Sequence, residues 1–187
     1  MEALFVSTGL VAIAEIGDKT QLLALLLAAR FRKPLPIALG ILAATLANHA
    51  LAAWAGAEVA RWVGPEWMRW ILSAAFVAMA AWCLVPDKAD NLRATDGAGA
   101  FLTTVVSFFL VEISDKTQIA TVALAARFQE LLPVTLGTTA GLMLANVPVV
   151  LFGDAIARRL PLRIVRWIAA ALFVALGIAV ALTPLSP

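Results

Sequence analysis

The sequence AEIGDKTQ at residues 14–21 returns almost unchanged as VEISDKTQ at residues 111–118. Each copy lies inside a block of apolar residues with the character of a membrane span. A charged side chain inside a bilayer is costly, and such residues are rare there unless they have a function. Acidic residues placed twice in such blocks therefore indicate a functional site inside a membrane protein.

The composition favours a protein with several membrane spans. The 187 residues are 63% hydrophobic and 14% charged, and the apolar residues form long blocks instead of the one-face spacing of a soluble helix. The pI near 9.1 does not indicate a nucleic-acid partner, because the basic residues form short clusters between apolar blocks, as topology signals do. The single Cys83 excludes a disulfide framework and a cysteine-based metal motif.

Six apolar blocks are long enough to cross a bilayer as tilted or upright helices. The N-terminus lacks the positive region of a cleavable signal peptide, so the first block is expected to remain as a span. We expect a first transmembrane repeat at residues 1–85, a cytoplasmic linker at 86–100 and a second transmembrane repeat at 101–187. The six expected spans cover residues 3–29, 35–57, 68–85, 100–126, 132–153 and 164–183.

The two halves of the chain are copies separated by 97 positions. Glu15 corresponds to Glu112 (112 − 15 = 97), and the strings AARF, RWI and FVA each recur at the same offset. Three spans per repeat is an odd number, so the second copy must enter the membrane from the opposite side. The expected fold is an all-α integral membrane protein with six transmembrane helices arranged as two inverted three-helix repeats. Many secondary transporters have this architecture, with the substrate site near the membrane midplane.

The distribution of basic residues predicts the orientation. Most lysines and arginines outside the two motifs lie in or near the connections after the first, third and fifth spans. The positive-inside rule places these connections in the cytoplasm, so both termini are expected outside. The predicted location is the plasma (inner) membrane, which the chain would cross several times. A homo-oligomer is compatible with the sequence.

The spacing within each motif predicts one half of a shared cation site. Residues three apart lie on one face of a helix, so each motif helix would present two carboxylates and one amide along a stripe. Two such helices facing each other would surround one centre with oxygen ligands. The predicted ligands from the motifs are Glu15, Asp18, Gln21, Glu112, Asp115 and Gln118.

Oxygen ligands of this kind suit hard divalent cations such as Mn²⁺, Ca²⁺ and Mg²⁺, and the sequence has no His/Cys cluster to favour Zn²⁺ or Cu²⁺. Four clustered carboxylates cannot all stay ionised after a cation leaves, because repulsion and desolvation favour their protonation. The sequence therefore predicts cation/proton exchange. The cation and protons are then the substrates, the bilayer is the surroundings, and no prosthetic group is expected.

The other motif residues qualify this prediction. Gly17 predicts a break in the first motif helix, where Thr20 could bond freed carbonyls, whereas Ser114 makes the equivalent second break less secure. Lys19 and Lys116 each follow their glutamate by four residues, a spacing that allows a salt bridge within the motif. One interpretation is that this pairing merely makes a buried charge tolerable. The lysines would otherwise snorkel to the interface or compete with the cation.

Three further polar residues lie in the second and fifth expected spans. Asn48 and Asn146 are candidate cation ligands, or candidates to hold the ligands in place. His49 is a candidate proton relay, although a lone histidine more often packs or forms hydrogen bonds.

The pattern Glu-apolar-Gly-Asp-Lys-Thr, present at Glu15 and, with Ser114 in place of glycine, at Glu112, resembles the Gdt-type cation transporters. The resemblance covers essentially the whole chain. That family includes Golgi calcium/manganese transporters and bacterial manganese exporters. The resemblance implies export of a divalent cation, Mn²⁺ first and Ca²⁺ second, by proton exchange. Carried over to this chain, the ligands are Glu15, Asp18, Glu112 and Asp115, and Ser114 departs from the symmetry of the two half-sites.

Other classes of protein fit the residues less well. An exporter of amino acids or other small organic solutes on a similar inverted-repeat fold is the main alternative. Its site should include groups for both the carboxylate and the amine of the solute, whereas the sequence shows an excess of acids. An intramembrane aspartyl protease would leave Glu15 unexplained, and a structural scaffold has no use for buried carboxylates. We therefore expect a transporter and not an enzyme.

Overall fold

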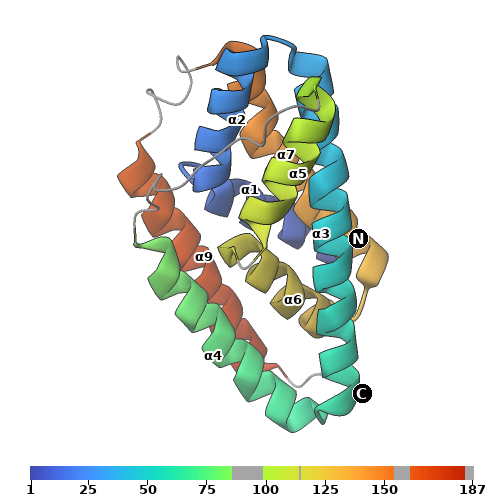
Figure 1. The fold of residues 1–187 in the computed structure, drawn as a ribbon. Coiled ribbons are helices and arrows are strands. Elements are labelled where there is room, and N and C mark those ends of the chain that lie inside the picture. The colour runs from blue at the N-terminus through green and yellow to red at the C-terminus, as the bar shows by residue number, and fades with distance from the viewer. Residues whose placement is uncertain (86–98, 114, 154–160, 184–187) are drawn as a thin grey trace.

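The computed structural model describes residues 1–85, 99–113, 115–153 and 161–183, and these residues form helices and their connections, with no strand among them. The predicted linker at 86–100 lies almost wholly outside the described residues. Figure 1 shows the helices packed as a bundle with α4 beside α9 along one side. The helices are α1 (Glu2–Glu15), α2 (Lys19–Phe31), α3 (Pro34–Trp62), α4 (Pro65–Cys83), α5 (Gly99–Glu112), α6 (Lys116–Phe128), α7 (Leu131–Phe152) and α9 (Leu162–Leu182).

Two of the predicted spans are broken. The expected span 3–29 divides into α1 and α2, and the expected span 100–126 divides into α5 and α6. The predicted break at Gly17 is confirmed, because this residue has a φ of 82°, which favours glycine. In the second half, α5 ends at Glu112 and α6 begins at Lys116, so the helix is also interrupted where glycine is replaced. Residue 114 itself lies outside the described residues.

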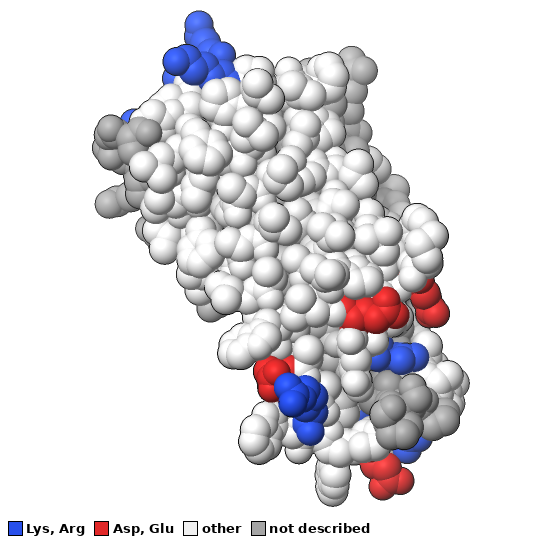
Figure 2. Space-filling view, turned by 90° about the vertical axis from the view of Figure 1, so that its right-hand side faces the viewer, with Lys and Arg blue, Asp and Glu red and all other residues white. Residues whose placement is uncertain are grey.

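The surface and interior have the polarity of a membrane protein. Three helices, Pro34–Trp62, Leu131–Phe152 and Leu162–Leu182, are long and apolar enough to cross a bilayer. Large apolar side chains are exposed on most helices, whereas several charged and amide side chains are buried. Figure 2 shows a wide region without charged side chains on one face, with charged side chains above it and towards its lower end.

Helices of one half pack mainly against helices of the other half. The principal contacts join α1 to α7, α3 to α5 and α6, and α4 to α9. Close approaches repeat with the halves exchanged. A Cβ atom on Gly40 would lie 2.7 Å from Cβ of Thr104, and one on Gly137 would lie 2.9 Å from Cβ of Ser7. Gly40 and Gly137 are 97 positions apart, and so are Ser7 and Thr104, so the same crossing is built twice.

The equivalent residues Phe76 and Phe173 meet each other directly between α4 and α9. Their ring centroids are 6.3 Å apart with an interplanar angle of 27°, and both side chains are fully buried. Offset aromatic pairs of this kind add to the stabilisation from burial alone. A contact between two residues related by the offset of 97 places them where the two halves meet.

Candidate metal centre

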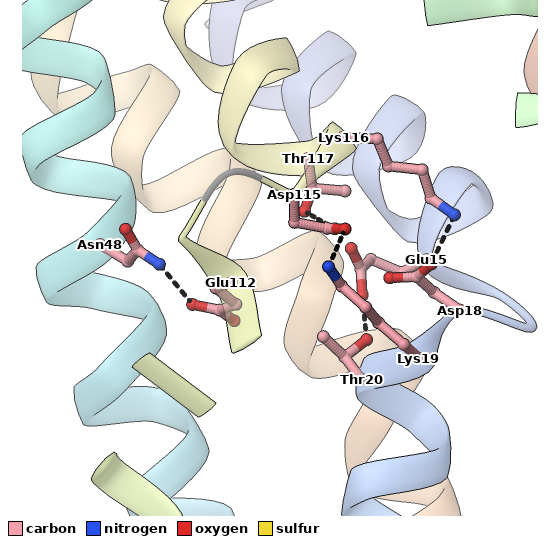
Figure 3. A network of polar contacts seen from close by, with 9 residues as sticks. All are labelled: Glu15, Asp18, Lys19, Thr20, Asn48, Glu112, Asp115, Lys116 and Thr117. Atoms are coloured by element: carbon pink, nitrogen blue, oxygen red, sulfur yellow. Dashed lines mark hydrogen bonds and ion pairs between the residues drawn. The ribbon is translucent and has the colours of Figure 1, made fainter. Parts of the chain in front are cut away.

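Three carboxylates meet in the interior of the bundle at the two helix breaks. Glu15 is the last residue of α1, Asp18 is the N-cap of α2 and Asp115 is the N-cap of α6. Each residue offers one oxygen atom, and these oxygens all lie within 4.8 Å of one another. All three side chains are buried, with exposed fractions of 0% to 2%. Figure 3 shows the three acids converging from both halves of the chain.

The helix breaks, and not a continuous helical stripe, create this arrangement. The prediction that Glu15 and Asp18 share a face of one helix is wrong, because the helix ends between them and Asp18 has an extended backbone. Asp115 is extended in the same way at the start of α6. Helix N-termini carry a partial positive charge, which favours the carboxylates of Asp18 and Asp115. Glu15 lies instead at a helix C-terminus, where a cation is favoured.

The lysines of the motifs form ion pairs that cross between the halves. Lys116 Nζ lies 2.5 Å from Asp18 Oδ1, and Lys19 Nζ lies 2.9 Å from Asp115 Oδ1. Each lysine therefore holds the aspartate of the other motif, at positions related by the offset of 97. The alternative of Glu–Lys pairing within each motif does not describe these contacts. The two pairs differ in burial, because Lys116 is 7% exposed and Lys19 is 26% exposed.

Glu112, the fourth predicted acid, is held to one side by α3. Its Oε1 accepts a hydrogen bond from Thr45 Oγ1 at 2.7 Å, and its Oε2 accepts one from Asn48 Nδ2 at 3.3 Å. Gln118 Nε2 donates to Asn48 Oδ1 at 2.5 Å, so both ends of that asparagine amide are used. Glu112 remains within electrostatic range of Glu15 and Asp115, but it is outside the compact group of three oxygens.

The second half has no counterpart for the groups that hold Glu112. The positions equivalent to Thr45 and Asn48 are Leu142 and Ala145, whose side chains cannot form hydrogen bonds. Glu15 is instead bonded at one oxygen, because Thr20 Oγ1 donates to its Oε2 at 2.5 Å. Thr20 was expected to bond freed carbonyls and does not. Oε1 of Glu15 is buried and has no hydrogen-bond partner among the described residues.

The remaining predicted ligands have other contacts. Gln21 accepts a hydrogen bond from the Gly17 N–H at 2.8 Å and donates to the Ala145 carbonyl at 2.8 Å, so its amide braces the break between α1 and α2. Asn146 donates to the Leu142 carbonyl at 3.1 Å, while its Oδ1 is buried and has no hydrogen-bond partner within the described part of the chain. Thr45 was not predicted as part of the site, because a threonine within an apolar helix gives no local signal that it reaches a glutamate of another helix.

The site and fold define a class of protein. Oxygen atoms from buried carboxylates are the ligands that hard divalent cations prefer. A buried carboxylate oxygen without a partner is costly unless a cation, proton or water satisfies it. A charged centre of this kind within apolar helices, built where two similar halves meet, is typical of an ion transporter.

Comparison with known proteins places the chain within that class. The family model for the divalent cation/proton antiporter GDT1 matches residues 3–91 and 100–186. A protein of Vibrio cholerae serotype O1 (strain ATCC 39541 / Classical Ogawa 395 / O395), named "Putative manganese exporter", is 50% identical over 182 residues, which cover 97% of this chain and 91% of that protein. No solved structure matches the chain. The chain belongs to the GDT1 family of divalent cation/proton antiporters.

Proposed function

We propose that this protein exports Mn²⁺ across the plasma membrane in exchange for protons, and that Glu15, Asp18 and Asp115 bind the cation. The observation that carries the proposal is the convergence of three buried carboxylate oxygens within 4.8 Å of one another. Family membership supports the exchange of a divalent cation for protons. The name of the Vibrio cholerae relative favours manganese as the first cation to test and Ca²⁺ as the second.

The proposed architecture is six membrane spans in two inverted repeats, with both termini outside. The broken segments α1–α2 and α5–α6 would each form one span, and the remaining four described helices would form the others. The exchanged contacts at Gly40 and Gly137 support a pseudo-twofold relation between the halves. The site would then lie near the midplane, where discontinuous helices bind substrates in other transporters of this kind.

The crossed ion pairs suggest how the site behaves without its cation. Three carboxylates carry a charge of −3 and the two ammonium groups carry +2, so −3 + 2 leaves one negative charge. A proton on Glu15 would balance that charge, because its Oε1 has no partner among the described residues. An arriving divalent cation would displace this proton and the lysine ammonium groups from the acids. Cation and proton would thereby compete for one site, which is the requirement for exchange.

Transport by purified protein in lipid vesicles tests this proposal. Wild type should transport Mn²⁺ in one direction while protons move in the opposite direction. Glu15→Gln and Asp115→Asn should reduce this transport strongly. Glu66→Gln is the matched control, because Glu66 is an exposed acid in the first turn of α4. Undiminished Mn²⁺ transport by both site variants would refute the proposed site. Transport of Ca²⁺ or of an amino acid without transport of Mn²⁺ would change the proposed substrate.

A further inference from the structure

The two repeats position their motif glutamates with nearly the same backbone. Glu15 is the last residue of α1, and Glu112 is the last residue of α5. The Asp18 N–H donates to the Glu15 carbonyl at 3.1 Å, and the Asp115 N–H donates to the Glu112 carbonyl at 3.0 Å in the equivalent turn. Both aspartates are extended, with φ of −83° and −81°. The local geometry therefore allows each glutamate side chain to lie beside its own aspartate.

Only the first glutamate takes that position. An oxygen of Glu15 belongs to the compact group of carboxylates, whereas Figure 3 shows Glu112 turned away from that group and towards α3. The threonines that follow the two breaks differ accordingly. Thr20 donates to Glu15, but its equivalent Thr117 donates to Asp115 at 3.1 Å. The second half therefore lacks the contact between threonine and glutamate that the first half makes.

Two side chains of α3 hold Glu112 in its different position. Thr45 Oγ1 and Asn48 Nδ2 donate to separate oxygens of Glu112. Gln118 Nε2 donates to Asn48 Oδ1, so the amide nitrogen of Asn48 faces the carboxylate, which can only accept. Thr45, Asn48 and Glu112 are 0% to 1% exposed, so water competes little for these bonds. Hydrogen bonds to a carboxylate are stronger than those between neutral groups, and these two fix both of its oxygens.

The other half shows the same arrangement without these donors. The equivalent residues on α7 are Leu142 and Ala145, whose side chains cannot form hydrogen bonds. α7 lies beside the first break, because Gln21 donates to the main-chain carbonyl of Ala145. Neither side chain can draw Glu15 away, and Glu15 lies among the carboxylates. The different positions of the two glutamates thus follow from the two donors of α3.

We infer that Thr45 and Asn48 are positioning residues that hold Glu112 away from the cation, so that three carboxylates bind it and a fourth does not. This inference rests on the proposed function. Transport requires that an ion bind firmly enough to enter a site and weakly enough to leave it. A fourth carboxylate would add an oxygen ligand and a negative charge in a buried site, where opposite charges attract strongly. Holding Glu112 aside therefore lowers the affinity for Mn²⁺ and speeds its release.

Binding and transport of Mn²⁺ by the variant Thr45→Val/Asn48→Ala, the α3 variant, test the inference. Glu112 should then join the cation, so Kd and KM for Mn²⁺ should fall by about tenfold, since groups behind metal ligands change affinity by that factor or more. The kcat for transport should fall as well, because release is slower, whereas a merely structural role predicts weaker binding. Thr45→Ser keeps the hydroxyl and should behave as wild type. Thr138→Val is the matched control and should leave Kd unchanged, because this buried hydroxyl donates within its own helix, to the Val134 carbonyl.

Glu112→Gln tests the inference without any change in α3. Alone, it should weaken Mn²⁺ binding much less than Glu15→Gln does, because Glu112 is not a ligand while α3 holds it. Added to the α3 variant, it should abolish the gain in affinity. The comparison of Glu112→Gln with Glu15→Gln decides the question even where the α3 variant is unfolded.

Two results would overturn the inference while the proposed function stands. One is unchanged or weaker Mn²⁺ binding by the folded α3 variant, and the other is an equal loss of Mn²⁺ binding in Glu112→Gln and Glu15→Gln. Failure of wild type to bind or transport Mn²⁺ would overturn both the inference and the proposed function.

Discussion

Replacing Lys116 with glutamine should remove the ammonium group that pairs with the buried carboxylate of Asp18. Lys116 Nζ lies 2.5 Å from Asp18 Oδ1, and the two side chains are 7% and 0% exposed. Removing one partner of a buried ion pair costs about 3–5 kcal/mol, because the other charge stays in the interior. Lys19→Gln should cost less, since Lys19 is 26% exposed and water partly screens its pair, although Asp115 itself is only 2% exposed.

The free energy of unfolding in mild detergent, measured with and without Mn²⁺, checks this prediction. Lys116→Gln should be the least stable protein without cation, and it should gain more stability from Mn²⁺ than wild type does, because the cation no longer has to displace an ammonium group. The double variant Asp18→Asn/Lys116→Gln should regain stability but lose much of its response to Mn²⁺. A Lys116→Gln protein as stable as wild type, or less responsive to Mn²⁺, would refute the reasoning.

Two glycine substitutions test the close approaches that build the site. Gly56→Ala should lower the temperature of thermal unfolding and weaken transport, because the new Cβ would lie 2.1 Å from the main-chain oxygen of Val122 in α6, which cannot move aside alone. Gly9→Ala is the control and should have little effect on thermal unfolding, because nothing lies within 4 Å of a Cβ atom at that position. Gly17→Ala should cost about 1 kcal/mol or more from its φ of 82° and also meet Leu162 Cδ2 at 2.7 Å. Gly99 also has a positive φ, 72°, but nothing lies within 4 Å of a Cβ atom added there, so Gly99→Ala measures the backbone effect alone. Equal losses of transport in Gly17→Ala and Gly99→Ala would contradict a special role for the break at Gly17.

The sequence predicted the elements that depend on local pattern. Blocks of apolar residues and the offset of 97 predicted the helical membrane protein and the meeting of the two motifs. Gly17 predicted the first break correctly, because glycine readily adopts a positive φ. The duplicated acids indicated a cation transporter, and the family comparison shows that class.

The sequence could not predict which side chains of the two motifs pair. Helical spacing suggested Glu–Lys pairs within a motif, but the breaks turn Lys19 and Lys116 towards the aspartates of the opposite halves. Such pairing depends on tertiary packing and leaves no local periodicity. The separation of Glu112 from the other acids has the same origin, since it depends on Thr45 reaching across from α3.

The asymmetry between the half-sites could be recognised only after the fold was known. Thr45 and Asn48 differ from their equivalents Leu142 and Ala145 in the sequence. The structure explains these differences, because α3 holds both oxygens of Glu112, whereas one oxygen of Glu15 has no partner among the residues that the structure describes. Ser114 was the expected source of asymmetry, yet α5 and α6 are separated as α1 and α2 are.

Proton release during Mn²⁺ binding tests the central claim most directly. Purified protein in weakly buffered detergent solution is mixed with Mn²⁺ while a pH-sensitive dye and the bound metal are both measured. Wild type should release protons as Mn²⁺ binds, and Glu15→Gln should bind Mn²⁺ more weakly and release fewer protons per cation. Binding of Mn²⁺ to wild type without proton release, or the same release per cation from Glu15→Gln, would contradict cation/proton competition at this site.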